Sequence, residues 1–498
     1  MLSKAKTKTL AVVSLIIYIV SLIPVIYIGF FNYASGDDYY YGIPVKNAIA
    51  NNATVWEIIK IAWKDVIREY YAFQGTLATM FVWRFEPAIW GEKVYSITIF
   101  IALIMLNIGI FFLLHVVMVR VMKIEVSSYI SASALALFFI VQFITFPRSG
   151  LYFFPGVIRY TLSFGLVCLA MGLIILYLDK GYKRYFAGIV VLLAYLGGSG
   201  FPAIVMSGLG GLFLMFLGGL SDDKGRKRRS LFLIIPLFIE LIGFGIAATC
   251  PGNANRGGED FGFSIDRVFT VFYRCFADGT THLFKYFIDA RPLILLPITL
   301  FILAYVSKST VKLRVKDILI VGVLGWFIVC MVRSPEYYAG ETVDGGISGG
   351  VYDSYFYVSI IYIIIMSTML GLYFGFRKKS ETLSRNAIGA LLIFMVLFVV
   401  LLNRHLLPNM LNYTIYEYVI TGQAREYDAQ MQQRFKLLSN PDELDVVVPM
   451  INDQQGPLMH MAVTDDPAAY TNVVTAQFYG KRSITAIDRK EWNELYGE

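Results

Sequence analysis

The chain has 498 residues, of which 57% are hydrophobic, 15% aromatic and only 16% charged. Soluble globular proteins carry about 25% charged residues, so this composition excludes that class. Apolar runs of roughly 17–24 residues recur along the chain, and runs of this length cross a bilayer as helices. We therefore predict an all-α polytopic membrane protein.

The apolar runs predict about eleven transmembrane helices. Their approximate boundaries are 10–31, 95–119, 129–146, 161–178, 185–199, 202–220, 230–249, 291–306, 317–333, 355–376 and 387–403. Residues 1–403 thus form the predicted transmembrane domain. Residues 404–498 follow it as a small cap outside the membrane.

Basic residues set the predicted orientation of these helices, because cytoplasmic loops are rich in Lys and Arg. About half of the 43 basic residues lie in alternate short loops. These loops contain the groups Lys4–Lys8, Arg120–Lys123, Lys180–Arg184, Lys224–Arg229, Lys308–Lys316 and Arg377–Arg385. We expect a multi-pass protein of the plasma membrane with its N-terminus inside and its C-terminus outside. The net charge of +7 then reflects topology, and we expect no nucleic-acid partner.

The first outer loop, residues 32–94, begins with two adjacent carboxylates among tyrosines. Residues 35–42 read SGDDYYYG and directly follow the first apolar run. Ionisable groups beside lipid are costly and mark functional sites. Asp37 and Asp38 are therefore the candidate catalytic residues, and Tyr39 and Tyr40 are candidates for the acceptor groove. The alternative is a polar turn at the end of a helix.

The same loop contains a predicted amphipathic helix at residues 54–70. Apolar side chains share one face at helical spacing, while Asp65 and Glu69 fall on the polar face. Thr54 and Glu57 have the spacing of a capping box. A tryptophan-containing amphipathic helix next to a transmembrane span is typical of helices that lie in the membrane interface. A second short helix is expected between residues 74 and 85.

Residues 147–160 form a second outer segment that contains Arg148, Arg159 and Tyr152. Glycine and proline interrupt this segment, so we expect it to re-enter the membrane from the outside and to line a cavity. The planar guanidinium group of arginine matches phosphate. Arg148 and Arg159 are therefore candidate donor-phosphate ligands, and Tyr152 is a candidate groove residue.

Two further outer positions are candidates for phosphate contact. Residues 250–258 read CPGNANRGG, and their glycine and asparagine residues permit a loop whose backbone amides converge with Asn253 and Arg256 on an anion. Arg333 lies at the outer end of the ninth apolar run. The alternative for an arginine at a helix end is a side chain that extends to the membrane surface.

Glu240 lies near the middle of the seventh apolar run. It either lines a cavity or makes a structural hydrogen bond between helices. The four histidines lack the spacing of a zinc site. No cofactor is assigned with certainty, and Asp37 and Asp38 are the candidates if a divalent cation such as Mg²⁺ or Mn²⁺ binds.

The pattern resembles the GT-C class of polytopic glycosyltransferases, and more narrowly its bacterial members that modify cell-surface polysaccharides. The resemblance rests on the acidic pair after the first span, the amphipathic helix 54–70, Pro251-Gly252-Asn253 with Arg256, and residues 472–480. Where the class often has a tryptophan, this chain has Tyr152-Phe153-Phe154.

The resemblance implies that a sugar moves from a polyprenyl-phosphate carrier to a cell-surface polysaccharide or lipid-linked glycan at the outer face. One of the two aspartates would be the general base, with Asp37 favoured, and the reaction would invert the anomeric carbon. The partners would be the lipid-linked sugar, the glycan acceptor and the bilayer. The alternatives are a lipid-linked saccharide transporter or flippase, and a membrane acyltransferase.

Overall fold

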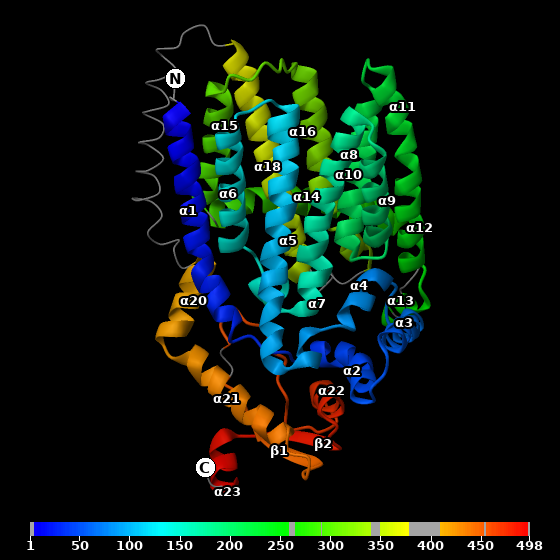
Figure 1. Cartoon of the computed structure of the whole chain (residues 1–498), viewed down its shortest axis with the longest axis vertical. Helices are drawn as coiled ribbons and strands as arrows, with labels where there is room; N and C mark the ends of the chain where they lie inside the picture. Colours follow the sequence, from blue (N-terminus) through cyan, green and yellow to red (C-terminus); the bar gives the residue numbers. More distant parts are fainter. Residues whose placement is uncertain are drawn as a thin grey trace.

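The computed structural model describes residues 4–257, 264–289, 291–339, 349–377, 409–452 and 455–496. Figure 1 shows three layers along the long axis of the molecule. Long helices form a bundle that includes the N-terminus, short helices of the first long loop lie below it, and the C-terminal segment lies lowest. The N-terminus and C-terminus are therefore at opposite ends.

Seven helices of the bundle are long and apolar enough to cross a membrane. They are Thr7–Gly29, Glu92–Val121, Phe154–Lys180, Phe201–Gly219, Lys224–Ala248, Val315–Ala339 and Gly349–Arg377. An eighth results if the bent pair Ile265–Ile288 and Pro292–Val306, which turns by 98°, counts as one span. The described residues thus show a multi-pass membrane protein.

The predicted number of eleven spans is not confirmed. The runs at 129–146 and 185–199 form α6 (Val126–Gln142) and α9 (Lys183–Gly197), of 17 and 15 residues. Both are shorter than a typical transmembrane helix of about 20 residues. The run at 291–306 is one arm of the bent pair. The run at 387–403, and with it the proposed domain boundary, lies outside the described residues.

Close packing of small residues holds the bundle together. Gly109 of α5 (Ile97–Leu114) faces Gly165 of α8 (Ser163–Lys180), and a Cβ atom added to Gly109 would lie 2.7 Å from the Gly165 carbonyl oxygen. Helices in membranes associate through such small residues because lipid supplies no hydrophobic drive between them. The apolar helices α10 (Phe201–Gly219), α12 (Ile234–Ala248), α15 (Leu295–Val306), α16 (Val315–Met331) and α18 (Gly349–Arg377) complete this bundle.

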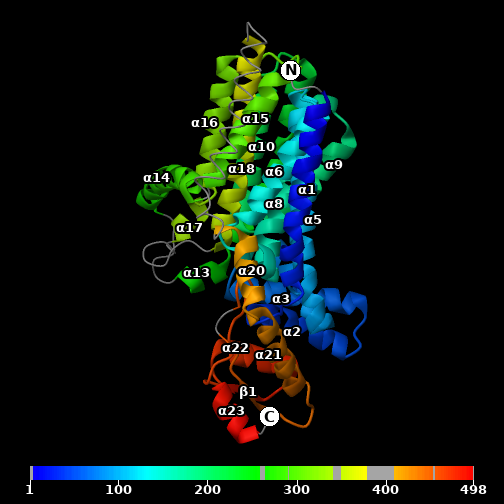
Figure 2. The same cartoon turned by 90° about the vertical axis from the view of Figure 1, so that its left-hand side faces the viewer.

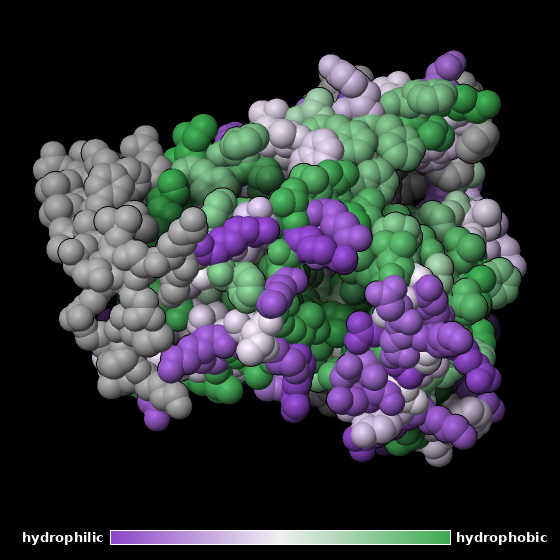
Figure 3. All heavy atoms as spheres, turned by 90° about the horizontal axis from the view of Figure 1, so that it is seen from above, coloured by the Kyte–Doolittle hydropathy of each residue, from purple (hydrophilic) through white to green (hydrophobic). Residues whose placement is uncertain are grey.

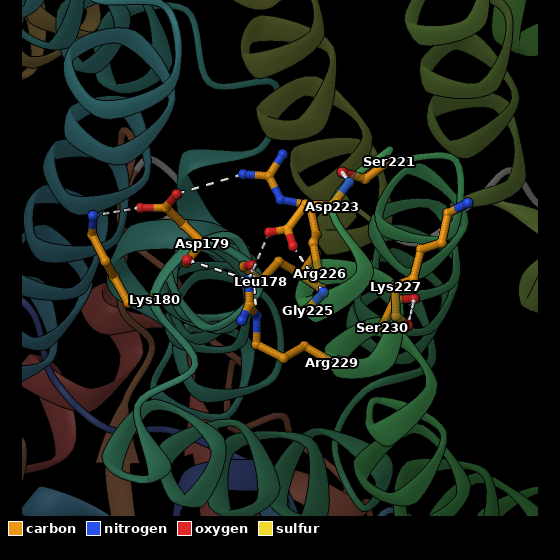
Figure 4. A network of polar contacts seen from close by, with 10 residues as sticks. All are labelled: Leu178, Asp179, Lys180, Ser221, Asp223, Gly225, Arg226, Lys227, Arg229 and Ser230. Carbon is orange, nitrogen blue, oxygen red and sulfur yellow. Dashed lines mark hydrogen bonds and ion pairs between the residues drawn. The ribbon is translucent and has the colours of Figure 1, made fainter.

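The N-terminal end of the bundle carries the basic loops that the structure describes. Hydrophilic side chains gather on this face (Figure 3). Arg229 of α11 (Lys224–Phe232) donates from Nε to the Leu178 carbonyl oxygen at 2.9 Å and contacts Asp223 at 3.4 Å, which ties α11 to the end of α8 (Figure 4). Arg226 reaches Asp179 of α8 at 3.5 Å in the same network.

At the other end of the bundle, the first long loop folds into α2 (Asp37–Ala50), α3 (Val55–Ala72) and α4 (Leu77–Trp83). The predicted amphipathic helix and its Thr54–Glu57 capping box are confirmed. Asp65 and Glu69, predicted on the polar face, are instead buried. They are buried because Asp65 pairs with Arg84 at 2.7 Å and Glu69 accepts a hydrogen bond from Tyr40.

The second half of residues 147–160, predicted as a broken re-entrant segment, belongs to a long apolar helix. A π-helical turn (Arg148–Tyr152) precedes helical residues Phe154–Leu162, which continue without a break into α8. Residues 154–160 are therefore the start of the span Phe154–Lys180, and the turn Arg148–Tyr152 lies just before it. Residues Pro251–Gly257, predicted as an open loop, form the short helix α13. Figure 2 shows that α14 (Ile265–Asp289) lies across the direction of the bundle helices.

The C-terminal segment begins with α20 (Leu411–Ile420) and α21 (Gln423–Leu438). Strands β1 (Asp445–Pro449) and β2 (Ser483–Ile487) then pair in parallel, with Val446 opposite Ile484. Helix α22 (Tyr470–Tyr479) lies in the connection between them, and α23 (Arg489–Tyr496) ends the segment. Parallel strands need such a crossover connection. Figure 1 shows α22 next to α2, which carries the acidic pair.

Candidate functional site

The two adjacent aspartates at the start of α2 face different surroundings. Asp38 is 1% exposed. Its Oδ1 accepts a hydrogen bond from the Tyr95 hydroxyl at 2.8 Å, and its Oδ2 accepts one from the Ser35 backbone amide at 3.1 Å. Burial raises the pKa of Asp38 well above its usual value. The buried hydrogen bonds of Asp38 therefore hold the start of α2 in place.

Asp37 faces a cavity of about 590 Å³, within the size range of small-molecule sites. Its Oδ1 accepts a hydrogen bond from the hydroxyl of Tyr470 at 2.8 Å. Burial raises the pKa of Asp37, and the Tyr470 hydrogen bond partly opposes that rise. The cavity is lined by Asp37, Tyr40, Tyr41, Glu69, Ala72, Phe73, Gln74, Trp83, Ser149, Phe153, Pro155, Gly156, Arg159, Tyr160, Gly349 and Tyr470.

Arg159 supplies positive charge to the same cavity. Its Nη1 donates to the Gln74 side-chain oxygen at 3.3 Å, while its buried Nε has no hydrogen-bond partner among the described residues. A buried guanidinium donor without a partner is costly, and an anionic ligand would satisfy it. A carboxylate and a guanidinium group thus line one cavity, Asp37 from α2 and Arg159 from the start of the α8 span.

A second carboxylate, Glu69, lines the cavity from α3. Its Oε1 accepts a hydrogen bond from the Tyr40 hydroxyl at 2.6 Å and pairs with Arg68 at 3.0 Å. Glu69 is therefore already paired with a cation, Arg68, and with the hydroxyl of another cavity residue, Tyr40. Arg84, which is fully buried, pairs with Asp65 at 2.7 Å, and the pair holds α4 against α3.

Behind Asp38 lies a buried polar cluster that connects α2 to the C-terminal segment. Glu92 accepts hydrogen bonds from the hydroxyls of Tyr39 and Tyr479. The Lys46 ammonium group lies 3.4 Å from the ring centroid of Phe478, and burial lowers the pKa of Lys46 to about 8. These contacts seat α22 on α2 beside the acidic pair.

An apolar pocket of about 330 Å³ lies between helices at this end of the bundle. Its lining includes Trp63, Leu77, Phe81, Val82, Tyr195 and Ile246 from α3, α4, α9 and α12. The Ala78 backbone amide donates to the Gly198 carbonyl oxygen at 2.8 Å, and this hydrogen bond connects α4 to the end of α9. Helices α3 and α4 contribute to the lining of both the apolar pocket and the charged cavity, and Val82 of the pocket is followed in the chain by Trp83 of the cavity.

Three of the candidate residues predicted from the sequence, Asp37, Tyr40 and Arg159, meet in the cavity. Tyr39 points away from it, toward Glu92. Tyr152 is fully buried and donates to the Val25 carbonyl oxygen at 3.0 Å, which is a structural contact within the bundle.

Arg148 and Glu240 also make structural contacts outside the cavity. Arg148 donates from Nη2 to the Gly456 carbonyl oxygen at 2.9 Å, so it fastens the C-terminal segment to the bundle. Glu240 accepts a hydrogen bond from the Ser207 hydroxyl. Of the two interpretations of Glu240, the structure supports the interhelical hydrogen bond.

The predicted anion-binding loop around Asn253 is a helix that packs on α3. Asn253 donates from Nδ2 to the Ala247 carbonyl oxygen at 2.8 Å and closes the end of α12. A Cβ atom at Gly252 would lie 2.4 Å from the Phe73 amide nitrogen, so close packing accounts for this glycine. Arg256 lies in α13, and its side chain is outside the described part of the structure.

Arg333 follows α16 and is fully buried. Its guanidinium carbon lies 4.7 Å and 4.5 Å from the ring centroids of Tyr352 and Tyr355, and Nη1 lies 3.2 Å from His282 Nδ1. Arg333 is therefore held among aromatic rings outside the cavity lining.

Sequence reasoning missed several polar or aromatic residues of the cavity, among them Glu69, Gln74, Trp83 and Tyr470. Helical spacing assigned Glu69 to the polar face of a helix. Spacing within one helix does not reveal the contact with Tyr40, which comes from another helix. Tyr470 is separated from Asp37 by 433 residues, and no local pattern connects them. Trp83, in the short helix predicted after Gln74, was a residue in the sequence that could have pointed to this cavity.

Within the described ranges, no group of three or more His, Cys, Asp or Glu side chains is arranged to hold a metal ion. A scan of protein-family models, a search of curated proteins and a search of solved structures each found no match to this chain.

Proposed function

We propose that this protein is a membrane glycosyltransferase that moves a sugar from a polyprenyl-phosphate carrier to a glycan acceptor at the outer face of the membrane. The observation that carries the proposal is the shared cavity of Asp37 and Arg159, together with an apolar pocket that the same helices α3 and α4 line. Transfer from a lipid phosphate needs a base, a cationic phosphate site and a place for the lipid, and each has a candidate here.

In the proposed reaction, the oxygen of an acceptor hydroxyl attacks the anomeric carbon of the donor sugar. The bond between that carbon and the phosphate oxygen breaks, and the polyprenyl phosphate leaves with the electron pair. The Asp37 carboxylate takes the proton of the acceptor hydroxyl. A single displacement of this kind inverts the anomeric carbon.

The raised pKa of Asp37 supports its role as the base, because a carboxylate of higher pKa holds a proton more strongly. Asp38 is less suited, since Tyr95 and Ser35 already occupy its two oxygens. Arg159 would bind the departing phosphate through its guanidinium group, because Arg159 lines the cavity. The polyprenyl chain would then lie toward the apolar pocket.

The test is transfer by purified protein from a panel of polyprenyl-phosphate sugars, with and without Mg²⁺ or Mn²⁺. We expect Asp37→Asn to lose transfer about 10²–10⁴-fold, the usual contribution of a general base. Arg159→Gln should raise the donor KM. Arg226→Gln is the control, because Arg226 contacts Asp179 at the other end of the bundle, away from the cavity.

Equal activity of Asp37→Asn and wild type would refute the assignment of the base. If wild type consumes no donor from the panel under any of these conditions, the reaction class itself is wrong. Movement of an intact lipid-linked saccharide across vesicle membranes would then identify a transporter.

A further inference from the structure

The cavity has two walls that come from different parts of the molecule. Arg159, Tyr160 and Phe153 belong to the bundle side. Tyr470 belongs to the C-terminal segment, which Figure 1 shows on the far side of α2 from the bundle. Asp37 lies between the two, with its Oδ1 bonded to Tyr470. A donor anchored in the membrane would approach the cavity from the wall formed by the bundle. The wall formed by the C-terminal segment then remains for the acceptor, which is the second substrate.

Tyr470 is presented in a fixed position although half of its surface is exposed. It is the first residue of α22, and α22 is fastened at its other end by the Tyr479–Glu92 hydrogen bond. Asn472 donates to the carbonyl oxygens of Thr464 at 2.8 Å and Ile484 at 2.9 Å, which locks the first turn of α22 to β2. A rigid exposed aromatic ring offers contact area at a low cost in conformational entropy.

A second aromatic ring faces the same carboxylate. The ring centroids of Tyr40 and Tyr470 are 6.1 Å apart, and the rings are tilted by 51°. The Tyr40 hydroxyl is bonded to Glu69, so its ring orientation is also fixed. Hydrogen-bonding groups of Asp37 and Glu69 lie around these two rings. A pyranose ring has the complementary chemistry, with an apolar C–H face and hydroxyl groups at its edge.

We propose that Tyr470, with Tyr40, forms the acceptor subsite, and that the acceptor is a pyranose whose C–H face packs on the Tyr470 ring. This inference rests on the proposed function. The Tyr470 hydroxyl donates a hydrogen bond to Oδ1 of Asp37. Oδ2 of Asp37 is then the oxygen that takes the proton from the acceptor hydroxyl. Tyr470 is thus a binding residue that also positions the base, and the C-terminal segment selects the acceptor.

The test uses saturation-transfer NMR on the full chain in nanodiscs with a panel of methyl glycosides: glucoside, galactoside, mannoside, rhamnoside and N-acetylglucosaminide. We expect saturation of the ring C–H protons of at least one glycoside in wild type and in Tyr470→Phe, which keeps the ring. Tyr470→Ala should weaken binding about tenfold, the size of one aromatic contact. Tyr496→Ala is the control, because Tyr496 is exposed on α23 of the same segment.

The two proposals fail in different ways. Donor consumption in the presence of the glycosides is measured in parallel, and its absence in wild type counts against glycosyl transfer whatever the NMR shows. If donor is consumed but no glycoside at tens of millimolar is saturated, or Tyr470→Ala binds like wild type, the acceptor subsite is refuted. Tyr470→Leu guards against misfolding of the alanine variant, because it keeps apolar volume but lacks a ring face. Its binding should be weakened as in Tyr470→Ala, and binding equal to that of wild type would also overturn the subsite.

Discussion

Replacing each aspartate of the adjacent pair by asparagine should give opposite phenotypes. Asp38 accepts two buried hydrogen bonds, from Tyr95 at 2.8 Å and from the Ser35 amide at 3.1 Å. The amide of an asparagine has a single acceptor oxygen, so one of these two donors loses its partner. Asp37 accepts its hydrogen bond from Tyr470 on one oxygen, and asparagine retains that bond.

The magnitudes follow from these contacts. One unmade buried hydrogen bond costs about 1–3 kcal/mol, so Asp38→Asn should lower the midpoint of thermal unfolding by a few degrees. Its transfer rate should fall in part, because the start of α2 shifts and a misplacement of about 1 Å costs up to roughly 10²-fold. Asp37→Asn should change stability by less than about 0.5 kcal/mol and reduce transfer about 10²–10⁴-fold.

The assay pairs thermal unfolding of the purified variants with donor consumption under the same conditions. Stable but inactive Asp37→Asn, together with destabilised and partly active Asp38→Asn, is the expected pattern. A stable, inactive Asp38→Asn next to a fully active Asp37→Asn would show that the roles of the two carboxylates are reversed.

Two further predictions concern the contacts of the acidic pair with the C-terminal segment. Gly36 has φ +51°, and a Cβ atom there would lie 2.3 Å from the Met461 sulfur, so Gly36→Ala should release this segment to limited proteolysis and reduce transfer. Gly422→Ala, at φ +82° with open space around it, has the same backbone cost of about 1–2 kcal/mol without the clash and should resist proteolysis. The rate should fall as acid protonates Asp37, at a pH above the usual carboxyl range because the pKa of Asp37 is raised. Loss of the Tyr470 hydrogen bond in Tyr470→Phe raises this pKa further, so the acid limb of kcat/KM should move to higher pH, and an unmoved limb would contradict Asp37 as the titrating base.

Local signals in the sequence predicted the features that depend on neighbouring residues. The helix 54–70 and its capping box are confirmed because Thr54 and Glu57 interact within one turn. Apolar length predicted the membrane helices, but it does not show where a helix stops or bends. The 98° turn between Ile288 and Pro292 therefore appeared only in the structure.

The parts of the site that were missed depend on contacts between distant elements. The burial of Asp65 follows from Arg84, on the next helix, and no helical periodicity reveals that ion pair. The segment around Gly252 has the composition of a loop, yet it is helical and packed on the Phe73 backbone. Tertiary packing outweighs such local preferences.

The hydrogen bond between Asp37 and Tyr470 joins residues that lie 433 positions apart. A ribosome that adds about 5–20 residues per second needs roughly 20–90 s to pass from one to the other. The helices of the bundle can be inserted into the membrane during that interval, before α22 has been synthesised and can pack on α2. Assembly of the cavity is therefore among the last events in the biogenesis of this protein, and a nascent chain released early has a membrane bundle but an open, incomplete site.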